Sequence, residues 1–206
     1  MSMSSARPGD PLSTGPDTDS VEDNRAAIPL DGPTLGRVAI VTAQYFEDTE
    51  FFAPYYRFYE AHYEVDVLTP AGGPVTTAKG VVLYEGMSRI ADARPTDYDL
   101  IYIPGGLRAP ATLREDKVAL DFIRAFVDTG RLTSSMCHGG RVLAAADVVN
   151  GKRVTGWRGT ADELRAAGGI YVNEPAVEDG QFVTARQPSD IPRLLARLIA
   201  RLNGAG

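Results

Sequence analysis

Apolar runs of strand length alternate along the chain with segments of helical periodicity. Continuous runs lie at residues 37–43 and 98–103, and shorter strands are expected at residues 64–69 and 132–136. Runs without polar interruption predict strands buried on both faces, as in a parallel sheet covered by helices. Apolar residues spaced three and four apart predict the helices, which lie at residues 48–62, 113–129, 141–146, 162–167 and 191–202. The alternation predicts an α/β fold with a mostly parallel sheet.

Capping residues mark the expected starts of two helices. Asp48 or Thr49 can cap the first helix, because short polar side chains accept hydrogen bonds from the free amides there. Ser189 or Asp190 can cap the last helix in the same way.

Two segments predict hairpins. Residues 75–84 follow a Gly-Gly-Pro turn and indicate an extended arm or a hairpin. Residues 171–177 and 181–184 indicate a second hairpin around the Glu-Asp-Gly turn at residues 178–180.

Residues 1–33 differ in composition from the rest of the chain. They are rich in Ser, Pro, Gly and Asp, and they carry a net charge of −4 out of the total of −6. Such a segment buries too little apolar surface to offset its ordering entropy. We expect a disordered or loosely packed extension at residues 1–33 and one α/β domain at residues 34–206. The alternative is that the apolar end of the extension, residues 27–30, packs on the domain or on a partner subunit.

Composition narrows the classes of function. A single cysteine among 206 residues allows no intramolecular disulfide and fits a cytoplasmic protein. The sequence contains no stripe of basic residues of the kind that indicates nucleic-acid binding. It also contains no apolar run long enough to span a membrane. Motifs typical of nucleotide or zinc sites are missing from the sequence, so we expect neither a cofactor nor a metal.

The residues best suited to catalysis or ligand binding follow three of the predicted strands. Ligand sites in open α/β sheets form outside the carboxyl ends of the strands. The segments expected there are residues 44–50, 104–111 and 137–140.

Cys137 lies where the strand at residues 132–136 turns into a helix. A lone cysteine is more often a small buried apolar residue than a nucleophile. Here, however, the sulfur is expected near the amides that open a helix, which favour the reactive thiolate. Gly139 and Gly140 are expected to permit the sharp turn, as in the nucleophile elbow of serine hydrolases. His138 follows directly, and at an elbow both side chains can reach one cavity, although a packing role for this histidine stays open.

Two further residues complete the predicted site. Glu50 lies one turn into the first helix and can point over the strand ends at Cys137, as a general acid or base with a raised pKa. The alternative is an ordinary acidic residue of a first helical turn. The amides of Gly106 and His138 can form an oxyanion hole.

These pieces together resemble the ThiJ/PfpI superfamily, relatives of the class I glutamine amidotransferase domains. The resemblance covers residues 37–202 and is closest to the PfpI-type intracellular proteases and the deglycase or glyoxalase-like stress proteins. It rests on residues 46–50 (Phe-Glu-Asp-Thr-Glu), 103–106 (Ile-Pro-Gly-Gly), 108–110 (Arg-Ala-Pro), 136–139 (Met-Cys-His-Gly) and 186–190 (Arg-Gln-Pro-Ser-Asp).

The resemblance implies a flavodoxin-like three-layer sandwich with a nucleophile elbow. It also implies a homodimer or larger homo-oligomer and a small-molecule substrate. Cys137 would be the nucleophile, Glu50 the carboxylate that touches its sulfur, and His138 the partner base.

The sequence departs from the PfpI-type pattern at two positions. The glutamate that orients the histidine across the subunit interface in such members is Ala111 here. Asp162, at an acidic position of that branch, is a candidate substitute. Trp157 replaces a tyrosine near the pocket, which indicates a changed substrate.

Three functions are compatible with this site. The first is a cysteine-dependent hydrolase or glyoxalase/lyase-like enzyme acting on a small electrophile through Cys137, Glu50 and His138, with peptidase activity disfavoured. The second is a redox-sensing or stress-protective protein that acts through oxidation of Cys137. The third is a biosynthetic hydrolase or lyase for a specialised metabolite.

Overall fold

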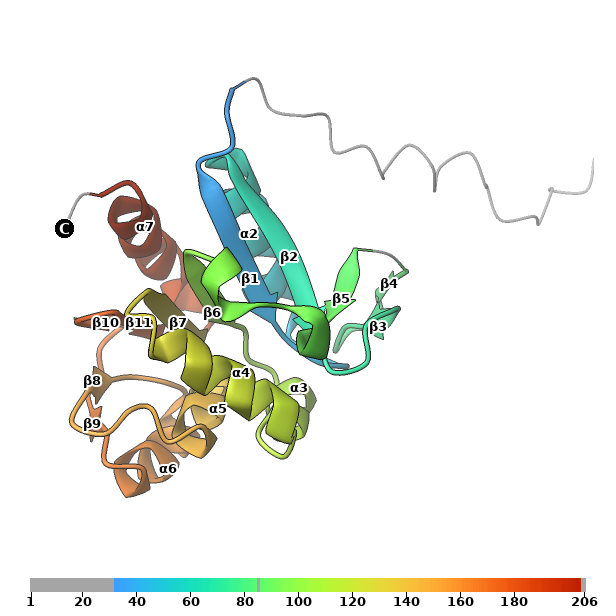
Figure 1. Cartoon of the computed structure of the whole chain (residues 1–206). Helices are drawn as coiled ribbons and strands as arrows, with labels where there is room; N and C mark the ends of the chain where they lie inside the picture. The colour runs from blue at the N-terminus through green and yellow to red at the C-terminus, as the bar shows by residue number, and fades with distance from the viewer. Residues whose placement is uncertain (1–31, 85, 205–206) are drawn as a thin grey trace, which may run out of the picture. The chain divides into compact units, whose positions relative to one another are not determined.

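A seven-stranded sheet forms the centre of the computed structural model, which describes residues 32–84 and 86–204 (Figure 1). The strand order is β10-β11-β7-β6-β1-β2-β5, and every neighbouring pair is parallel except β10 with β11. The strands of this sheet are β1 (Gly36–Val41), β2 (Tyr63–Thr69), β5 (Met87–Arg89), β6 (Leu100–Ile103), β7 (Leu132–Met136), β10 (Ala176–Asp179) and β11 (Phe182–Ala185). The predicted extension lies outside the described residues, apart from Gly32 and Pro33.

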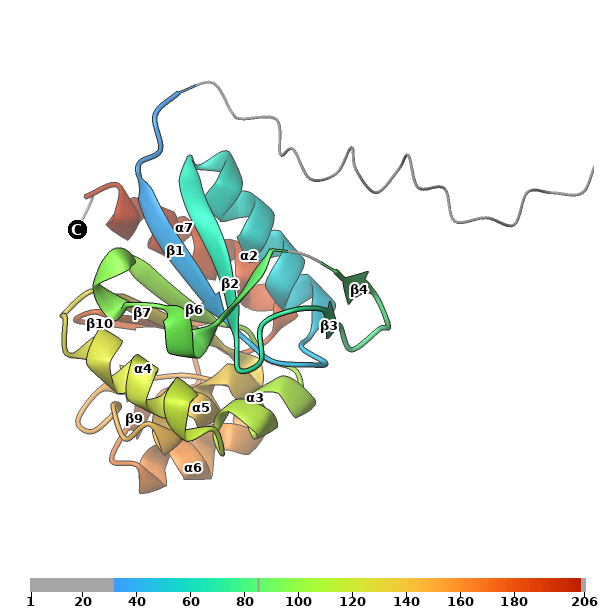
Figure 2. The ribbon, with the colours of Figure 1, turned by 45° about the vertical axis from the view of Figure 1, so that its right-hand side comes forward.

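Helices cover both faces of the sheet (Figures 1 and 2). One face carries α2 (Asp48–Glu60) and α7 (Ile191–Leu202), which pack against each other. The other face carries α3 (Arg108–Leu113), α4 (Lys117–Val127), α5 (Gly140–Ala145) and α6 (Ala161–Ala166). This arrangement confirms the predicted flavodoxin-like α/β sandwich with a mostly parallel sheet.

Short elements connect these layers. The 3₁₀ turns are η1 (Ile90–Asp92), η2 (Pro95–Asp97), η3 (Cys137–Gly139), η4 (Arg158–Thr160) and η5 (Pro188–Asp190). Two small pairings lie outside the main sheet, β3 (Val75–Thr76) with β4 (Val82–Leu83) and β8 (Arg153–Val154) with β9 (Ile170–Tyr171). Within the described residues, no helix is both long and apolar enough to span a bilayer.

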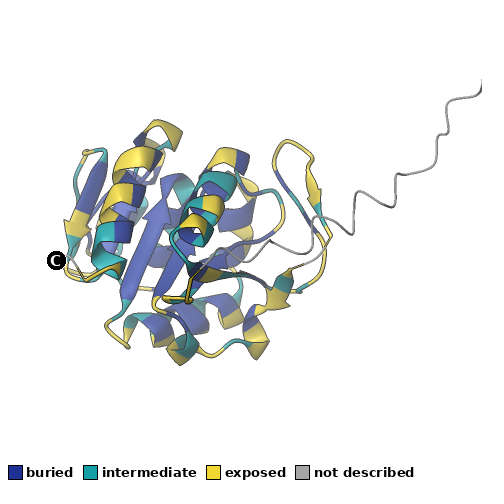
Figure 3. Ribbon diagram, turned by 90° about the horizontal axis from the view of Figure 1, so that it is seen from above, coloured by how far each residue is buried: buried dark blue, intermediate teal, exposed yellow. Residues whose placement is uncertain are grey.

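The two continuous apolar runs are the central strands. Residues 38–41 of β1 and residues 100–103 of β6 are completely buried. Figure 3 shows these strands buried between helices whose outer faces are exposed. Both faces of the strands are covered, so neither alternates between apolar and polar residues.

Three helix starts differ from the prediction. Glu47, not Asp48 or Thr49, caps α2, and its Oε2 accepts a hydrogen bond from the amide of Glu50 at 2.8 Å. The helix predicted at residues 113–129 begins instead at Lys117, because Asp116 caps α4, and the short helix α3 before it was not predicted. Asp190 precedes α7 but its carboxylate pairs with a nearby arginine and makes no side-chain capping bond.

The arm predicted at residues 75–84 is a hairpin of β3 and β4. Asp48 holds its tip: the Thr77 hydroxyl donates to Oδ1 at 2.6 Å, and the Lys79 amide donates to Oδ2 at 3.1 Å. This double contact brings Ala78 over the start of α2, beside the site described below.

The order of strands brings together the three segments that carry the candidate site residues. β7, β6 and β1 are adjacent and parallel, so their carboxyl ends lie at one edge of the sheet. Residues 44–50, 104–111 and 137–140 follow these ends and meet there, as the sequence predicts.

Candidate active site

Cys137 lies on a strained turn between β7 and α5. Its φ angle is +55°, in the left-handed region that residues with a side chain seldom adopt. Such a conformation costs about 1–3 kcal/mol and is often found at functional sites. Glycine is required at residue 139 by lack of space, because a Cβ atom there would lie 2.4 Å from the carbonyl oxygen of Ile103. The left-handed residue is Cys137 itself, and Gly139 instead permits close approach to β6.

Glu50 is completely buried in the first turn of α2 and faces the elbow. Its Oε2 accepts a hydrogen bond from the Gly105 amide at 2.8 Å. Oε1 is buried without a well-directed partner, and the thiol of Cys137 makes a weaker contact with the carboxylate. A thiol is a weak hydrogen-bond donor, so this contact is weaker than the bond from the Gly105 amide.

The pKa values of this pair are both raised. Burial raises the pKa of Glu50 to about 7, although contacts with the Cys137 thiol and the Gly105 amide act in the opposite direction. Burial, followed by the charge of Glu50, raises the pKa of Cys137 to about 12. The expectation that helix amides make Cys137 a ready thiolate is therefore wrong, because burial and the neighbouring carboxylate outweigh them. The two groups titrate as a coupled pair that holds one proton over a wide pH range.

His138 contacts the sulfur from the other side. Its Nδ1 lies 3.3 Å from Sγ of Cys137. Burial lowers the pKa of His138, the nearby charge of Arg141 lowers it further, and Glu163 partly opposes them. The imidazole is consequently neutral at physiological pH, so its Nδ1 can accept a proton from the thiol.

The predicted oxyanion donors converge on the same sulfur. The backbone amides of His138 and Gly106 both hydrogen-bond Cys137 and lower the pKa of its thiol. Gly106 has a φ angle of +97°, and a Cβ atom there would lie 2.8 Å from the amide of Glu47. Glycine is required at this position both by backbone conformation and by space.

Trp157 forms one wall of the site. Its indole stacks on the His138 ring at a centroid distance of 6.1 Å and an angle of 29°. Its amide donates a hydrogen bond to the carbonyl of Cys137 at 3.1 Å. Trp157 therefore holds both residues of the elbow, which agrees with its predicted place near the pocket.

Asp162 does not contact His138 within this chain, and its role as an orienter across a subunit interface stays a prediction. Its side chain is 98% exposed and pairs with Arg165 on the same helix. The acidic residue that acts on His138 is its neighbour Glu163, which binds Arg141 at 2.8 Å and Arg114 at 2.9 Å. Helical geometry turns adjacent residues about 100° apart, and the sequence carries no signal for which of the two faces inward.

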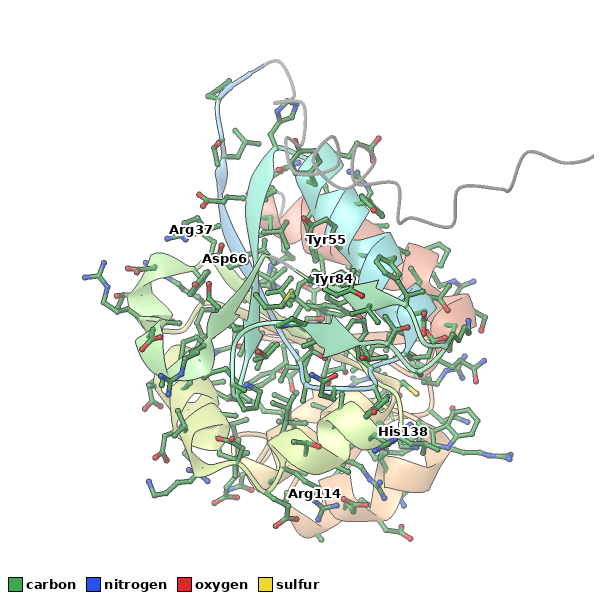
Figure 4. All side chains as sticks on the ribbon, turned by 90° about the vertical axis from the view of Figure 1, so that its right-hand side faces the viewer. Arg37, Tyr55, Asp66, Tyr84, Arg114 and His138 are labelled. Atoms are coloured by element: carbon green, nitrogen blue, oxygen red, sulfur yellow. The ribbon has the colours of Figure 1, made fainter. Side chains whose placement is uncertain are left out.

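A cavity of about 470 Å³ opens over the sulfur. Figure 4 shows His138 and Arg114 beside the helices of the second face, whereas Arg37 and Asp66 lie on the opposite side of the view. Six of the lining residues had no site role assigned from the sequence, because they are brought together only by the fold: Tyr45, Glu47, Ala78, Leu107, Arg108 and Pro188. The lining consists of Tyr45, Glu47, Glu50, Ala78, Gly106, Leu107, Arg108, Cys137, His138, Trp157 and Pro188.

No metal-binding cluster is formed by the described residues: nowhere in 32–84 and 86–204 do three His, Cys, Asp or Glu side chains converge suitably. The expectation of a site without a metal or cofactor stays a prediction. The chemistry available to the site consists of a buried thiol, a carboxyl group, a neutral imidazole and two amides. Those groups suffice for nucleophilic addition with proton transfer.

Comparison with known proteins extends these observations. The model of the DJ-1/PfpI family matches residues 36–201. The protein/nucleic acid deglycase 2 of Escherichia coli K12 is 33% identical over 171 residues, which are 82% of this chain and 98% of the relative. General stress protein 18 of Bacillus subtilis 168 is 32% identical over 168 residues, 81% of this chain and 97% of the relative.

A solved structure gives the same fold. It is a two-domain protein of Anabaena variabilis with a DJ-1/ThiJ/PfpI-like domain and a ferritin-like domain. The two structures superpose with a TM-score of 0.77 at 30% identity, over 81% of this chain and 50% of that chain. This chain therefore spans half the length of that protein.

Proposed function

This chain belongs to the DJ-1/PfpI family, and on that premise we propose that it is a cysteine-dependent enzyme acting on a small carbonyl electrophile. One observation carries the proposal. The Cys137 sulfur lies at the floor of a cavity of about 470 Å³, with His138 Nδ1 at 3.3 Å. The Glu50 carboxyl group and the amides of Gly106 and His138 contact the same sulfur.

The first step is addition of the thiol to an aldehyde carbon. Sγ of Cys137 forms a bond to the carbon while the thiol proton moves to Nδ1 of His138. The carbonyl electron pair moves onto oxygen, and the amides of Gly106 and His138 can stabilise that oxyanion. Return of the proton from His138 to this oxygen gives a hemithioacetal.

The second step moves a proton between neighbouring carbons. For an α-oxoaldehyde, the Glu50 carboxylate removes the proton from the former aldehyde carbon, and the neighbouring carbonyl oxygen takes up the electron pair to give an enediolate. The hydroxyl proton of the first oxygen passes to the second oxygen through His138, and Glu50 returns its proton to the adjacent carbon. The product is a thioester, which water hydrolyses to a 2-hydroxy acid and the free thiol. A pKa of about 7 suits Glu50 to both directions of transfer near neutral pH. A hydrolase with an ester or amide substrate would share the addition step and then expel a leaving group.

Product analysis with methylglyoxal tests the proposal. The wild-type protein is expected to form lactate, followed by proton NMR, and Cys137→Ala purified in the same way is expected to form none above background. Glu50→Gln should lower kcat by about 100-fold, the usual contribution of one general base. Lactate formation by Cys137→Ala at the wild-type rate would overturn the covalent mechanism.

A second function, redox sensing, is favoured by one observation. The amides that contact the sulfur can also hold an oxygen of a sulfinic acid. Two equivalents of peroxide would each transfer one oxygen to Cys137 and be reduced to water. Intact mass after mild peroxide treatment should then show a gain of about 32 mass units, the two oxygens of a sulfinic acid. Absence of that mass gain at Cys137 would contradict a redox-sensing function.

A further inference from the structure

Arg108 lies in the wall of the cavity and is held by an aromatic ring instead of a carboxylate. Its guanidinium carbon lies 3.7 Å from the centroid of the Tyr45 ring, and both residues line the cavity. Among residues 32–84 and 86–204, no acidic side chain pairs with Arg108. Stacking fixes the plane of a guanidinium but leaves its N–H donors free at the edge.

Arg158 is also held by an aromatic ring, on the exposed side of the lining residue Trp157. Its guanidinium carbon lies 5.5 Å from the centroid of the Trp157 ring, and within the described part of the chain it too has no acidic partner. Arg141 and Arg186, by contrast, are paired with Glu163 and Asp190. Arg108 is therefore an unpaired, stacked guanidinium in the cavity wall, and a second one stacks on the lining residue Trp157.

The acidic residues of the cavity do not cancel this charge. Glu47 caps α2 through the amide of Glu50 and lies 3.5 Å from the Lys79 ammonium, so its charge already has two partners. Glu50 is completely buried and has a pKa of about 7, so part of the population is neutral near physiological pH. The positive charge of Arg108 remains available to a ligand.

The cavity is also larger than a minimal substrate requires. Its volume is about 470 Å³, whereas a water molecule occupies about 30 Å³. A three-carbon oxoaldehyde would leave most of it empty. The remaining walls are apolar side chains from four separate segments, namely Tyr45, Ala78, Leu107 and Pro188.

We propose that the substrate carries an anionic group, a carboxylate or a phosphate, joined through an apolar body to the carbon that Cys137 attacks. Arg108 is the residue that binds the anion, and Arg158, which stacks on the lining residue Trp157, adds positive potential nearby. The apolar body occupies the space between the sulfur and Arg108. This inference rests on the proposed function for the reacting carbon, but the binding of an anion by Arg108 can be measured without any turnover.

Binding of unreactive probes tests the assignment. Trp157 is the only tryptophan in the sequence, so its fluorescence reports occupancy of the cavity directly. The probes are 3-phenylpropionate, phenyl phosphate and the neutral 3-phenylpropanamide. Wild-type protein is expected to bind the two anions at least about tenfold more tightly than the amide, the usual effect of one charge-assisted contact.

Variants of Arg108 separate charge from packing. Arg108→Gln is expected to remove the preference for anions while leaving the affinity for the amide unchanged, and Arg108→Lys is expected to retain part of the preference. Arg193→Gln, an exposed arginine on α7, is the control with the same change of net charge and should behave as wild type. Comparison of the two anions tells a carboxylate site from a phosphate site.

Two outcomes would overturn the proposal. One is equal affinity of wild-type protein for the anions and the amide, and the other is loss of affinity for all three probes in Arg108→Gln. Neither outcome depends on turnover of methylglyoxal, so the inference and the proposed function fail independently.

Discussion

The amide of Gly105 donates a hydrogen bond to Oε2 of Glu50 at 2.8 Å, which joins the loop after β6 to the first turn of α2. A side chain at residue 105 would prevent this approach. A Cβ atom there would lie 2.4 Å from Oε2 of Glu50 and 2.7 Å from Cβ of Cys137. The distance between the carboxyl group and the sulfur thus depends on a glycine that touches both.

Gly105→Ala should disrupt the site more than the fold. We expect turnover to fall by about 100-fold because the reacting groups are displaced, and stability to fall by about 1–3 kcal/mol from overpacking. Gly130→Ala is the control: that residue is left-handed with open space around it, so it should lose stability alone. Kinetics and urea unfolding of both variants measure the difference. Full activity in Gly105→Ala would show that the contact is dispensable.

Glu50→Gln should change how stability depends on pH. The folded pKa of Glu50 is about 7, above its ordinary value of 4.5. Between these values the folded state binds more protons than the unfolded state, so stability falls as pH rises, by about 3 kcal/mol in total. Gln does not titrate, so the variant should gain stability relative to wild type between pH 5 and pH 8. Urea unfolding at both pH values measures this, and parallel curves for the two proteins would contradict it.

Alkylation of Cys137 should follow the titration of the Glu50–Cys137 pair. The pair loses its first proton near pH 7, mainly from Glu50 because the pKa of Cys137 is about 12, and a small fraction of thiolate accompanies that charge. We expect the rate of modification by iodoacetamide, followed by intact mass, to rise through pH 7 in wild-type protein. Glu50→Gln should lack that midpoint, because the group that titrates there is gone. A midpoint near pH 7 in both proteins would assign it to another group.

Glu163→Gln should lower the pKa of His138 further. Glu163 raises that pKa and also binds Arg141, whose charge lowers it. Removal of the carboxylate leaves the arginine unbalanced near the imidazole. NMR titration measures the shift, and His62, the other histidine in the sequence, is an internal reference. Asp162→Asn should leave both histidines unchanged because Asp162 is exposed and paired with Arg165; a shift of His138 in that variant instead would reverse the assignment.

Much of the fold follows from the sequence because the decisive signals are local. The uninterrupted apolar runs of β1 and β6 can only be buried strands, and the order of strands then brings Glu50, Gly106 and Cys137 to one edge. The start of α4 was misplaced because it depends on which of several polar residues caps the helix, and Asp116 does so.

The site was less predictable where a property depends on contact between residues that are far apart in the sequence. The raised pKa of Cys137 comes from burial and from Glu50, which is 87 positions away in the sequence. The choice of Glu163 over Asp162 depends on the rotation of α6 against α5. Neither property is encoded in the spacing of residues around the elbow.

The hairpin of β3 and β4 has a consequence for redesign of the protein. The carboxylate of Asp48 holds the tip of the hairpin through Thr77 and Lys79. Ala78 is the residue of this hairpin that lines the cavity. The anchoring residues and the wall residue are thus different positions of one hairpin. A library of substitutions at residue 78 can vary cavity depth while Cys137, Glu50 and the anchor Asp48 keep their native identity.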